Sequence, residues 1–152
     1  MNRLEPYIYV TIQFTLLIAI VLLPGEPTTP VLQIIGLLLI GAGLIISFIA
    51  VWQLRKHSLT ALPTPIKNAK LLTSGLYAYA RHPIYTGLIL PMSGVIMSRF
   101  SLLRLLLLVS LVMLLYQKSK YEEAQLTEFF GKKYTDYIAK TGRFISMKNK
   151  TS

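Results

Sequence analysis

The chain has 152 residues, of which 53% are hydrophobic and only 14% charged, and it contains no cysteine. This composition excludes an ordinary soluble domain, in which about 25% of residues are charged, and it excludes disulfides and thiolate metal sites. Two histidines, His57 and His82, are too few for a His-based metal site, so no metal is expected. The net charge of +10 could favour binding to nucleic acid. The basic residues lie between and after apolar segments, however, which suits anionic lipid headgroups and not nucleic acid.

Four windows with almost no charge indicate an all-α integral membrane protein. A helix needs about 20 apolar residues, within a range of about 17–25, to cross the hydrocarbon core. We therefore expect about four transmembrane helices and, after them, a C-terminal cytoplasmic amphipathic helical segment. The expected spans lie near residues 7–23, 31–53, 83–98 and 101–117. Arg99 and Arg104, at the turn between the last two spans, are expected to extend to the far interface.

The distribution of basic residues predicts the orientation in the membrane. Fourteen Lys and Arg residues lie before the first span, in the 54–82 connection or after residue 117, and two lie at the other turn. By the positive-inside rule, both termini and the 54–82 connection are expected in the cytoplasm.

The chain is expected to form a single domain over residues 1–152, because it shows no internal repeat and no separate soluble unit. The connection after the second span contains Pro63-Thr64-Pro65, which favours extended backbone. The fourth helix is expected to continue beyond the membrane and to stop at Gly131. Beyond it, Tyr134 and Tyr137 recur at helical spacing, as in an amphipathic helix.

The first cluster that could carry chemistry is Arg81-His82-Pro83-Ile84-Tyr85, at the start of the third span. Proline suits a first helical turn, where its missing N–H is not needed. The start of a helix points backbone N–H groups and a partial positive charge outwards, which favours an anion. Two interpretations remain open here: a helix start at the lipid headgroups, or a ligand site at the membrane surface.

The second cluster is Lys118 with Glu122 and Glu123 on the continuation of the fourth helix. Lys118 and Glu122 are four residues apart and share a helix face. The two adjacent carboxylates point about 100° apart, so at most one is expected to face a site while the other is solvated. Taken alone, this pattern is typical of a wet helix surface. Together with the helix start, it could hold a zwitterionic ligand.

Three motifs occur together in the C-terminal part of the chain. The three are Arg81-His82-Pro83-Ile84-Tyr85-Thr86-Gly87, Glu122-Glu123-Ala124-Gln125-Leu126 and Phe130-Gly131-Lys132-Lys133-Tyr134-Thr135-Asp136-Tyr137. A fourth segment, Leu71-Leu72-Thr73-Ser74-Gly75-Leu76-Tyr77, precedes them. In this combination, residues 57–145 resemble the isoprenylcysteine carboxyl methyltransferase and phospholipid methyltransferase superfamily of integral membrane methyltransferases.

The resemblance implies a methyltransferase that uses S-adenosylmethionine and needs no Rossmann domain. The cofactor is then expected at the cytosolic interface, in a site built from residues 57–87 and 118–137. Cofactor-binding residues implied by the motifs are Ala69, Lys70, Leu71, Leu72, Gly75, Tyr77, His82, Pro83, Ile84, Tyr85 and Glu122. Candidate catalytic residues are Arg81, Lys118 and Glu123.

One position departs from the pattern. The isoprenylcysteine enzymes that this region resembles place an arginine four residues before the first glutamate, where it handles the substrate carboxylate, and this chain has Lys118 there. Lysine keeps the charge but loses the planar two-pronged geometry of a guanidinium.

The acceptor implied by the resemblance is a lipid-like or small apolar molecule in the membrane, and the reaction implied is methylation of a carboxyl oxygen. An amine N-methyltransferase of the phospholipid type is the alternative within the enzyme class, with Glu123 or His82 as the base. A non-catalytic membrane scaffold or transporter subunit is the alternative outside it. A transporter is expected to carry more polar residues in mid-span than Gln13, Gln33, Ser47 and Ser93. The sequence does not indicate the oligomeric state.

Overall fold

The structure, a computed structural model, describes residues 5–56 and 71–144. Two of the expected cofactor residues, Ala69 and Lys70, lie outside the described residues. The elements are α1 (Glu5–Leu22), β1 (Glu26–Pro27), α2 (Pro30–Lys56), the 3-10 helix η1 (Gly75–Ala78), α3 (Pro83–Ser98), β2 (Arg99–Phe100), α4 (Leu102–Phe130) and α5 (Lys132–Lys140). The all-helical architecture expected from the sequence is therefore confirmed.

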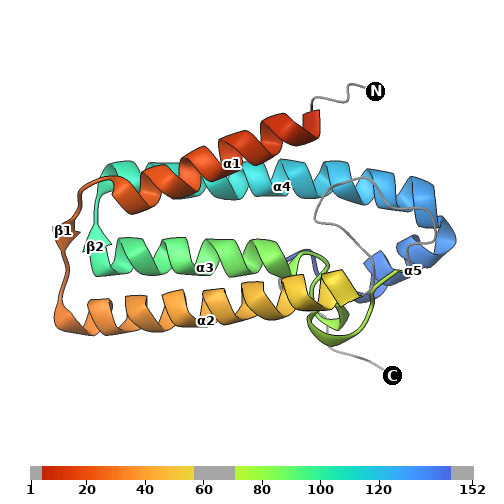
Figure 1. Ribbon diagram of the computed structural model, residues 1–152, viewed down its shortest axis with the longest axis horizontal. Coiled ribbons are helices and arrows are strands. Elements are labelled where there is room, and N and C mark those ends of the chain that lie inside the picture. Colours follow the sequence, from red (N-terminus) through yellow and green to blue (C-terminus); the bar gives the residue numbers. More distant parts are fainter. Residues whose placement is uncertain (1–4, 57–70, 145–152) are drawn as a thin grey trace.

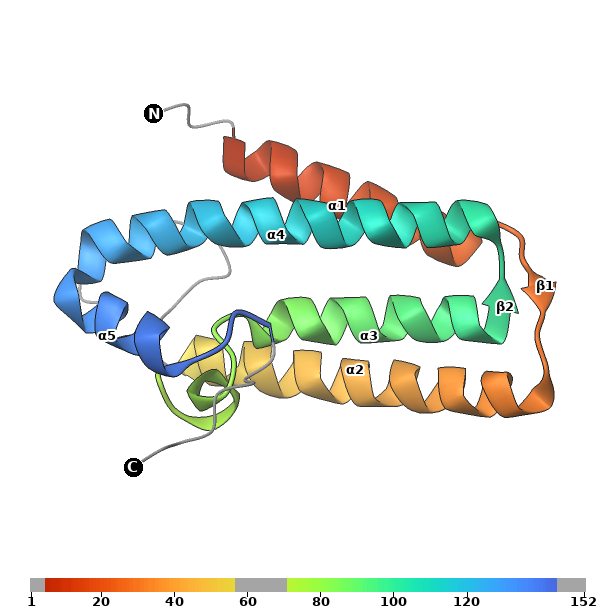
Figure 2. The same ribbon diagram turned by 180° about the vertical axis from the view of Figure 1, so that it is seen from behind.

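The long helices form two antiparallel pairs. Figures 1 and 2 show α1 lying along α4 and α2 lying beside α3. The two-residue strands β1 and β2 pair at one end of the bundle, with Glu26 opposite Phe100. At the other end lie η1, α5 and the start of α3 (Figure 1). We call these the strand end and the site end.

The pair α2 and α3 is packed backbone to backbone. The sequence places Gly36, Gly41 and Gly43 in the second span, and small residues predict close helix contact. A Cβ atom on Gly36 would lie 2.5 Å from the carbonyl oxygen of Gly94, and one on Gly43 would lie 2.3 Å from the ring of Pro91. The prediction is confirmed for these two glycines. It is wrong for Gly41, where an added Cβ would meet nothing within 4 Å.

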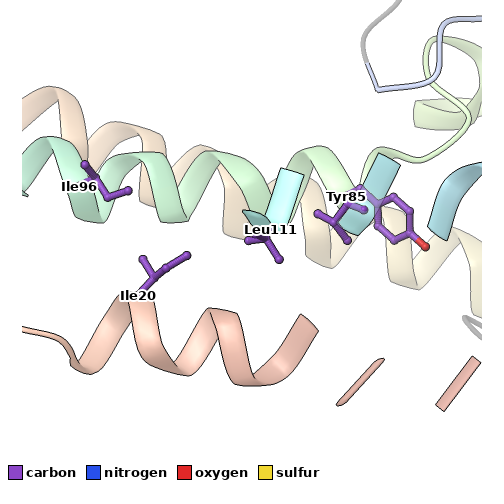
Figure 3. Close-up of a cluster of buried hydrophobic side chains, with 5 residues drawn as sticks. Ile20, Tyr85, Ile96 and Leu111 are labelled. Carbon is purple, nitrogen blue, oxygen red and sulfur yellow. The ribbon is translucent and has the colours of Figure 1, made fainter. Parts of the chain in front are cut away.

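The pair α1 and α4 joins the rest of the bundle through apolar side chains. Ile20 from α1, Tyr85 and Ile96 from α3, and Leu111 and Leu115 from α4 form one buried cluster. Figure 3 shows Ile20 pointing from α1 toward α3, with Tyr85 at the site end of the cluster. Because lipid tails are as apolar as these side chains, their close packing stabilises the bundle through van der Waals contact and not through removal from water.

Two arginine side chains connect the chain segments that meet at the strand end. Arg104 is only 5% exposed, and its guanidinium donates to the carbonyl oxygens of Leu23 and Arg99. The side chain thus extends toward the strand end, but its guanidinium is buried there among carbonyl groups. The last carbonyl groups of a helix have no partner within it, and those at the end of α1 attract the guanidinium. Arg99 is exposed and donates to the carbonyl oxygen of Gly25 at 3.0 Å.

The outer faces of the bundle are apolar. Within the described residues, two helices are long and apolar enough to cross a membrane, Pro30–Arg55 and Leu102–Phe130, and two shorter apolar helices are Tyr7–Leu22 and Pro83–Ser98. Exposed apolar side chains include Phe14, Ile18, Leu37, Phe48, Leu106 and Met113. So much exposed apolar surface suits hydrocarbon and is unusual for a protein in water.

The fourth helix continues well beyond the apolar window of its sequence. It runs unbroken to Phe130, and Gly131 follows with φ of +57°, a conformation that glycine adopts readily. The helix stop expected at Gly131 is confirmed. Because α4 is this long, it carries Lys118, Glu122 and Glu123 to the start of α3.

Candidate functional site

The two clusters identified in the sequence meet at the site end. The start of α3 brings Arg81 and His82 against Glu122 and Glu123 of α4, about 40 positions further along the chain. A third segment, residues 141–144, lies against the same place. We call it the C-terminal strap.

Glu123 is the centre of an ion-pair network. Its Oε1 accepts from Nε of Arg81 at 2.9 Å and from Nε of Arg143 at 3.1 Å, and its Oε2 accepts from Nη2 of Arg143 at 2.6 Å. Nε2 of His82 lies 3.2 Å from Oε1. The residue is 7% exposed. Charge-assisted bonds of this kind are about twice as strong as neutral ones, so Glu123 joins α3, α4 and the C-terminal strap.

Glu122 has a different environment. Both of its carboxylate oxygens accept from the hydroxyl of Tyr85, at 2.7 and 2.8 Å. Nδ1 of His82 lies 3.5 Å from Oε2, and the glutamate side chain is 13% exposed. The expectation that one of the two carboxylates is solvated is therefore wrong. The start of α3 faces one of them while the C-terminal strap reaches the other, so Glu123 is buried and Glu122 is largely buried.

The C-terminal strap holds the start of α3 through its backbone. The amide of Arg81 donates to the carbonyl oxygen of Gly142, and the amide of His82 donates to that of Arg143, both at 2.9 Å. The hydroxyl of Thr86 donates to the carbonyl oxygen of Phe144 at 2.7 Å. Because the amide of His82 is already engaged, the start of α3 is less open to an anion than the sequence suggested.

Arg143 is a site residue that sequence reasoning missed. It lies in the basic tail, where only its contribution to net charge was visible. In the structure its hydrogen bond to Glu123 raises the pKa of the guanidinium above its ordinary value, and the group also lies 4.8 Å from the centroid of the Tyr116 ring. No spacing rule connects Arg143 to the earlier motifs, so only the folded chain shows its role.

Aromatic rings line the region beside Glu122. The rings of His82 and Tyr85 are stacked, with centroids 5.1 Å apart and planes 8° apart. Phe144 lies tilted against both, at 6.4 Å from His82 and 6.2 Å from Tyr85. A carboxylate next to aromatic faces is suited to a cationic or polar ligand group.

Lys118 also lies near the Tyr85 ring. Its ammonium is 5.3 Å from the centroid of the Tyr85 ring and donates to Oε1 of Gln13 on α1 at 3.0 Å. The structure thus brings Lys118 to the same region as Glu122 but gives it a partner from the first helix.

Three more of the expected cofactor residues, Leu72, Gly75 and Tyr77, lie in η1 or just before it and contact the end of α2. Leu72 and Tyr77 are buried in a cluster with Ala50, and the hydroxyl of Tyr77 donates to the carbonyl oxygen of Ala50 at 3.4 Å. Burial raises the pKa of the Tyr77 hydroxyl, which keeps it neutral. Gly75 has φ of +63°, and a Cβ there would lie 2.3 Å from the amide nitrogen of Gln53.

Three further expected residues complete the description. Pro83 is the first residue of α3 and is buried. Ile84 packs against both apolar clusters and so connects this wall to the bundle core. Leu71 is half-buried in the irregular segment before η1.

Comparison with known proteins points to one class of enzyme. Residues 31–133 match the sequence model of a family described as phospholipid methyltransferase. A solved structure of the eukaryotic intramembrane Ras methyltransferase ICMT (isoprenylcysteine carboxyl methyltransferase) has a similar fold, with a TM-score of 0.66 and 23% sequence identity. The similarity covers 97% of this chain and 54% of that one, so the chain spans about half the length of the solved structure. No curated protein matches the sequence.

Proposed function

The chain belongs to the phospholipid methyltransferase family, and on that premise we propose that it is a membrane enzyme that transfers the methyl group of S-adenosylmethionine to an acceptor dissolved in the membrane. We include in this proposal that all four long helices cross the bilayer and that both termini and the site end face the cytoplasm. The apolar outer faces and the excess of basic residues at that end support this orientation.

The observation that carries the proposal is the contrast between Glu122 and Glu123. Glu123 is already neutralised by two guanidinium groups. Glu122 is largely buried, yet its close hydrogen bonds come from the neutral hydroxyl of Tyr85. A buried carboxylate without a guanidinium is suited to bind a cation.

S-adenosylmethionine fits this donor set. It carries a sulfonium, an ammonium and a pair of ribose hydroxyls, and Glu122 would bind the ammonium or the hydroxyl pair. The stacked rings of His82 and Tyr85 would lie against the ligand, since aromatic faces attract cations. Leu72, Gly75 and Tyr77 would support the wall from the side of α2.

When bound, S-adenosylmethionine supplies an electrophilic methyl carbon, and the protein has little covalent chemistry to perform. Its residues must hold the two reactants in line, which can contribute about 7–11 kcal/mol. The C-terminal strap and Tyr85 would keep water away from the reacting atoms. Arg81 and Glu123 are better suited to holding α3, α4 and the strap in register than to proton transfer, because their charges are mutually satisfied.

The acceptor is proposed to be a carboxylate on a lipid-like molecule. A carboxylate needs no base, and Glu123 is poorly placed to act as one because its oxygens already accept from Arg81 and Arg143. Phospholipid amine N-methylation is the second candidate, favoured by the description of the matched family. It requires proton removal, for which His82 is the remaining candidate near Glu122.

The test is S-adenosylmethionine binding to the detergent-purified protein by titration calorimetry. The variant Glu122→Gln is expected to bind about tenfold more weakly or worse, because a hydrogen bond to a charged group contributes about 1.5–3 kcal/mol. Glu128→Gln is the matched control, since Glu128 is exposed on the same helix, and it should bind like the wild type. Folded wild-type protein that binds no S-adenosylmethionine would overturn the proposal in this form and leave either an enzyme that binds its acceptor first or a non-catalytic scaffold.

A further inference from the structure

The side chains proposed to hold the cofactor are closed off from water. Those of His82 and Glu122 are 8% and 13% exposed, and Tyr85 is 6% exposed. A ligand that enters from the cytoplasm and contacts all three must displace a neighbouring part of the chain. Among the described residues, the neighbours belong to the long helices, which are packed in the apolar core, and to the C-terminal strap. The strap is therefore the part that can move most easily.

The strap is fixed where it begins. Thr141 is 6% exposed, and its hydroxyl donates to a carbonyl oxygen of α5 at 2.7 Å. The guanidinium of Arg81 donates to the carbonyl oxygens of Ile138 and Thr141. Figure 2 shows the chain running from the end of α5 toward the start of α3. An opening movement is thus confined to residues 142–144, which turn at Thr141.

Residues 142–144 are held by an ion pair that water can reach. The side chain of Arg143 is 23% exposed, whereas that of Arg81, the other guanidinium on Glu123, is 8% exposed. When Arg143 leaves, Glu123 still accepts from Arg81 and stays next to His82, so no buried carboxylate is left unpaired. A partly exposed ion pair contributes little to stability, unlike a fully buried one. The strap can therefore open without disturbing the pair beneath it.

The same three residues carry one aromatic ring of the site. Phe144 lies tilted against the rings of His82 and Tyr85, with centroids 6.4 and 6.2 Å away. Its carbonyl oxygen accepts from the hydroxyl of Thr86 at 2.7 Å. Because Arg143 directly precedes Phe144, the ion pair with Glu123 also holds this ring in place. Release of the ion pair would uncover the two rings proposed to lie against the cofactor.

We propose that residues 142–144 are a cover over the cofactor site, which the ion pair of Arg143 with Glu123 keeps closed and which opens for the cofactor to enter and its product to leave. The inference rests on the proposed function and deepens it, because it concerns the exchange of S-adenosylmethionine for S-adenosylhomocysteine. A closed cover excludes water during methyl transfer, and its opening limits product release. Arg143 is then a positioning residue, since it acts on the ligand through Phe144.

A disulfide that holds the cover closed tests this directly. The chain has no cysteine, and Ala80 and Gly142 are partners in a parallel bridge, a spacing that a disulfide can span. The double variant Ala80→Cys with Gly142→Cys is loaded with radiolabelled S-adenosylhomocysteine while reduced, then oxidised and chased with unlabelled ligand. The oxidised protein should release the label about tenfold more slowly than the reduced protein, because the opening step is blocked. Added reductant should restore fast release.

A matched disulfide at the strand end is the control. Glu26 and Phe100 are partners in the two-stranded sheet, so Glu26→Cys with Phe100→Cys places the same kind of cross-link at the far end of the bundle. Oxidation of this variant should leave the release of the label unchanged. The cysteine-free wild type, treated with the same oxidant, shows whether the oxidant itself affects binding.

Two substitutions at Arg143 test the ion pair. Arg143→Gln removes the charge and should speed release of the label about fivefold, in the range of one partly exposed ion pair. Arg143→Lys keeps the charge but loses the two-pronged contact with Glu123, so its release rate should lie between that of Arg143→Gln and that of the wild type. A merely structural role predicts that both variants lower the thermal midpoint while the label leaves at the wild-type rate.

Equal release from the oxidised and reduced forms of Ala80→Cys with Gly142→Cys overturns the proposal. So does a disulfide that forms in the free protein and not in the loaded one, because the cover must close over the bound ligand. Unchanged release from Arg143→Gln overturns the role of the ion pair. Wild-type protein that binds S-adenosylmethionine without these effects refutes the cover alone, whereas wild-type protein that binds none refutes the proposed function and the cover with it.

Discussion

Arginines stabilise both ends of the bundle, but they bind different partners. At the site end, Arg81 and Arg143 pair with the carboxylate of Glu123. At the strand end, Arg104 donates to backbone carbonyl oxygens, including those of Leu23 and Arg99. Among residues 5–56 and 71–144, the two pairs of a guanidinium with a carboxylate, Arg81–Glu123 and Arg143–Glu123, both lie at the site end.

This difference indicates which end of the bundle is suited to bind a ligand. Backbone carbonyl groups at the end of α1 would lack these donors without Arg104, so this arginine completes the fold. The site end instead has two adjacent carboxylates and engages only one of them with guanidinium groups. Glu122 contacts Tyr85 and His82 but no guanidinium, and the described residues of the strand end include no carboxylate that is largely buried in this way.

The largest effect is expected from breaking the network of the site end. Glu123→Gln leaves two guanidinium groups without their carboxylate, and loss of one partner of a buried ion pair costs about 3–5 kcal/mol. The variant should lower the thermal midpoint of the detergent-purified protein strongly. Glu128→Gln, on the exposed side of α4, should melt like the wild type. An unchanged midpoint in Glu123→Gln would mean that the network is not structural.

A smaller effect is expected at the strand end. Arg104→Met keeps much of the side-chain volume but leaves the carbonyl groups at the end of α1 without a donor, which costs about 1–3 kcal/mol. Thermal melting should record this loss, while S-adenosylmethionine affinity stays at the wild-type value. Weakened cofactor binding at an unchanged midpoint would contradict the separation of the two ends.

The sequence predicted the helices that form both ends because the position of a helix depends on local properties of the chain. Charge-free windows defined the helices, and the third span, near residues 83–98, coincides with α3 (Pro83–Ser98). The motifs around His82 and Glu122 were expected in one site, and the structure places them together. Helix-forming and helix-starting residues act on their near neighbours, so these features are visible in the order of the residues.

The partners of the buried charged groups could not be predicted in this way. Arg104 is bonded to the end of α1, more than 80 positions away, and Lys118 to Gln13, 105 positions away. A signal did exist for two of them, since Arg104 and Gln13 are isolated polar residues in apolar windows. Such a residue must find a partner, but residue type and spacing do not say which one.

The smallest effect on stability is expected when Arg99 is replaced. This variant shows how much the burial of an arginine contributes to its effect. Arg99 donates to the carbonyl oxygen of Gly25 at 3.0 Å, the same kind of contact that Arg104 makes, but Arg99 is exposed. Water can replace a lost donor there, so Arg99→Ala should change the free energy of unfolding by no more than about 0.5 kcal/mol. Thermal melting of Arg99→Ala beside Arg104→Met makes the comparison directly. Equal losses in the two variants would show that burial does not explain the importance of Arg104, whereas the expected gap shows that the strand end depends on the one arginine that water cannot reach.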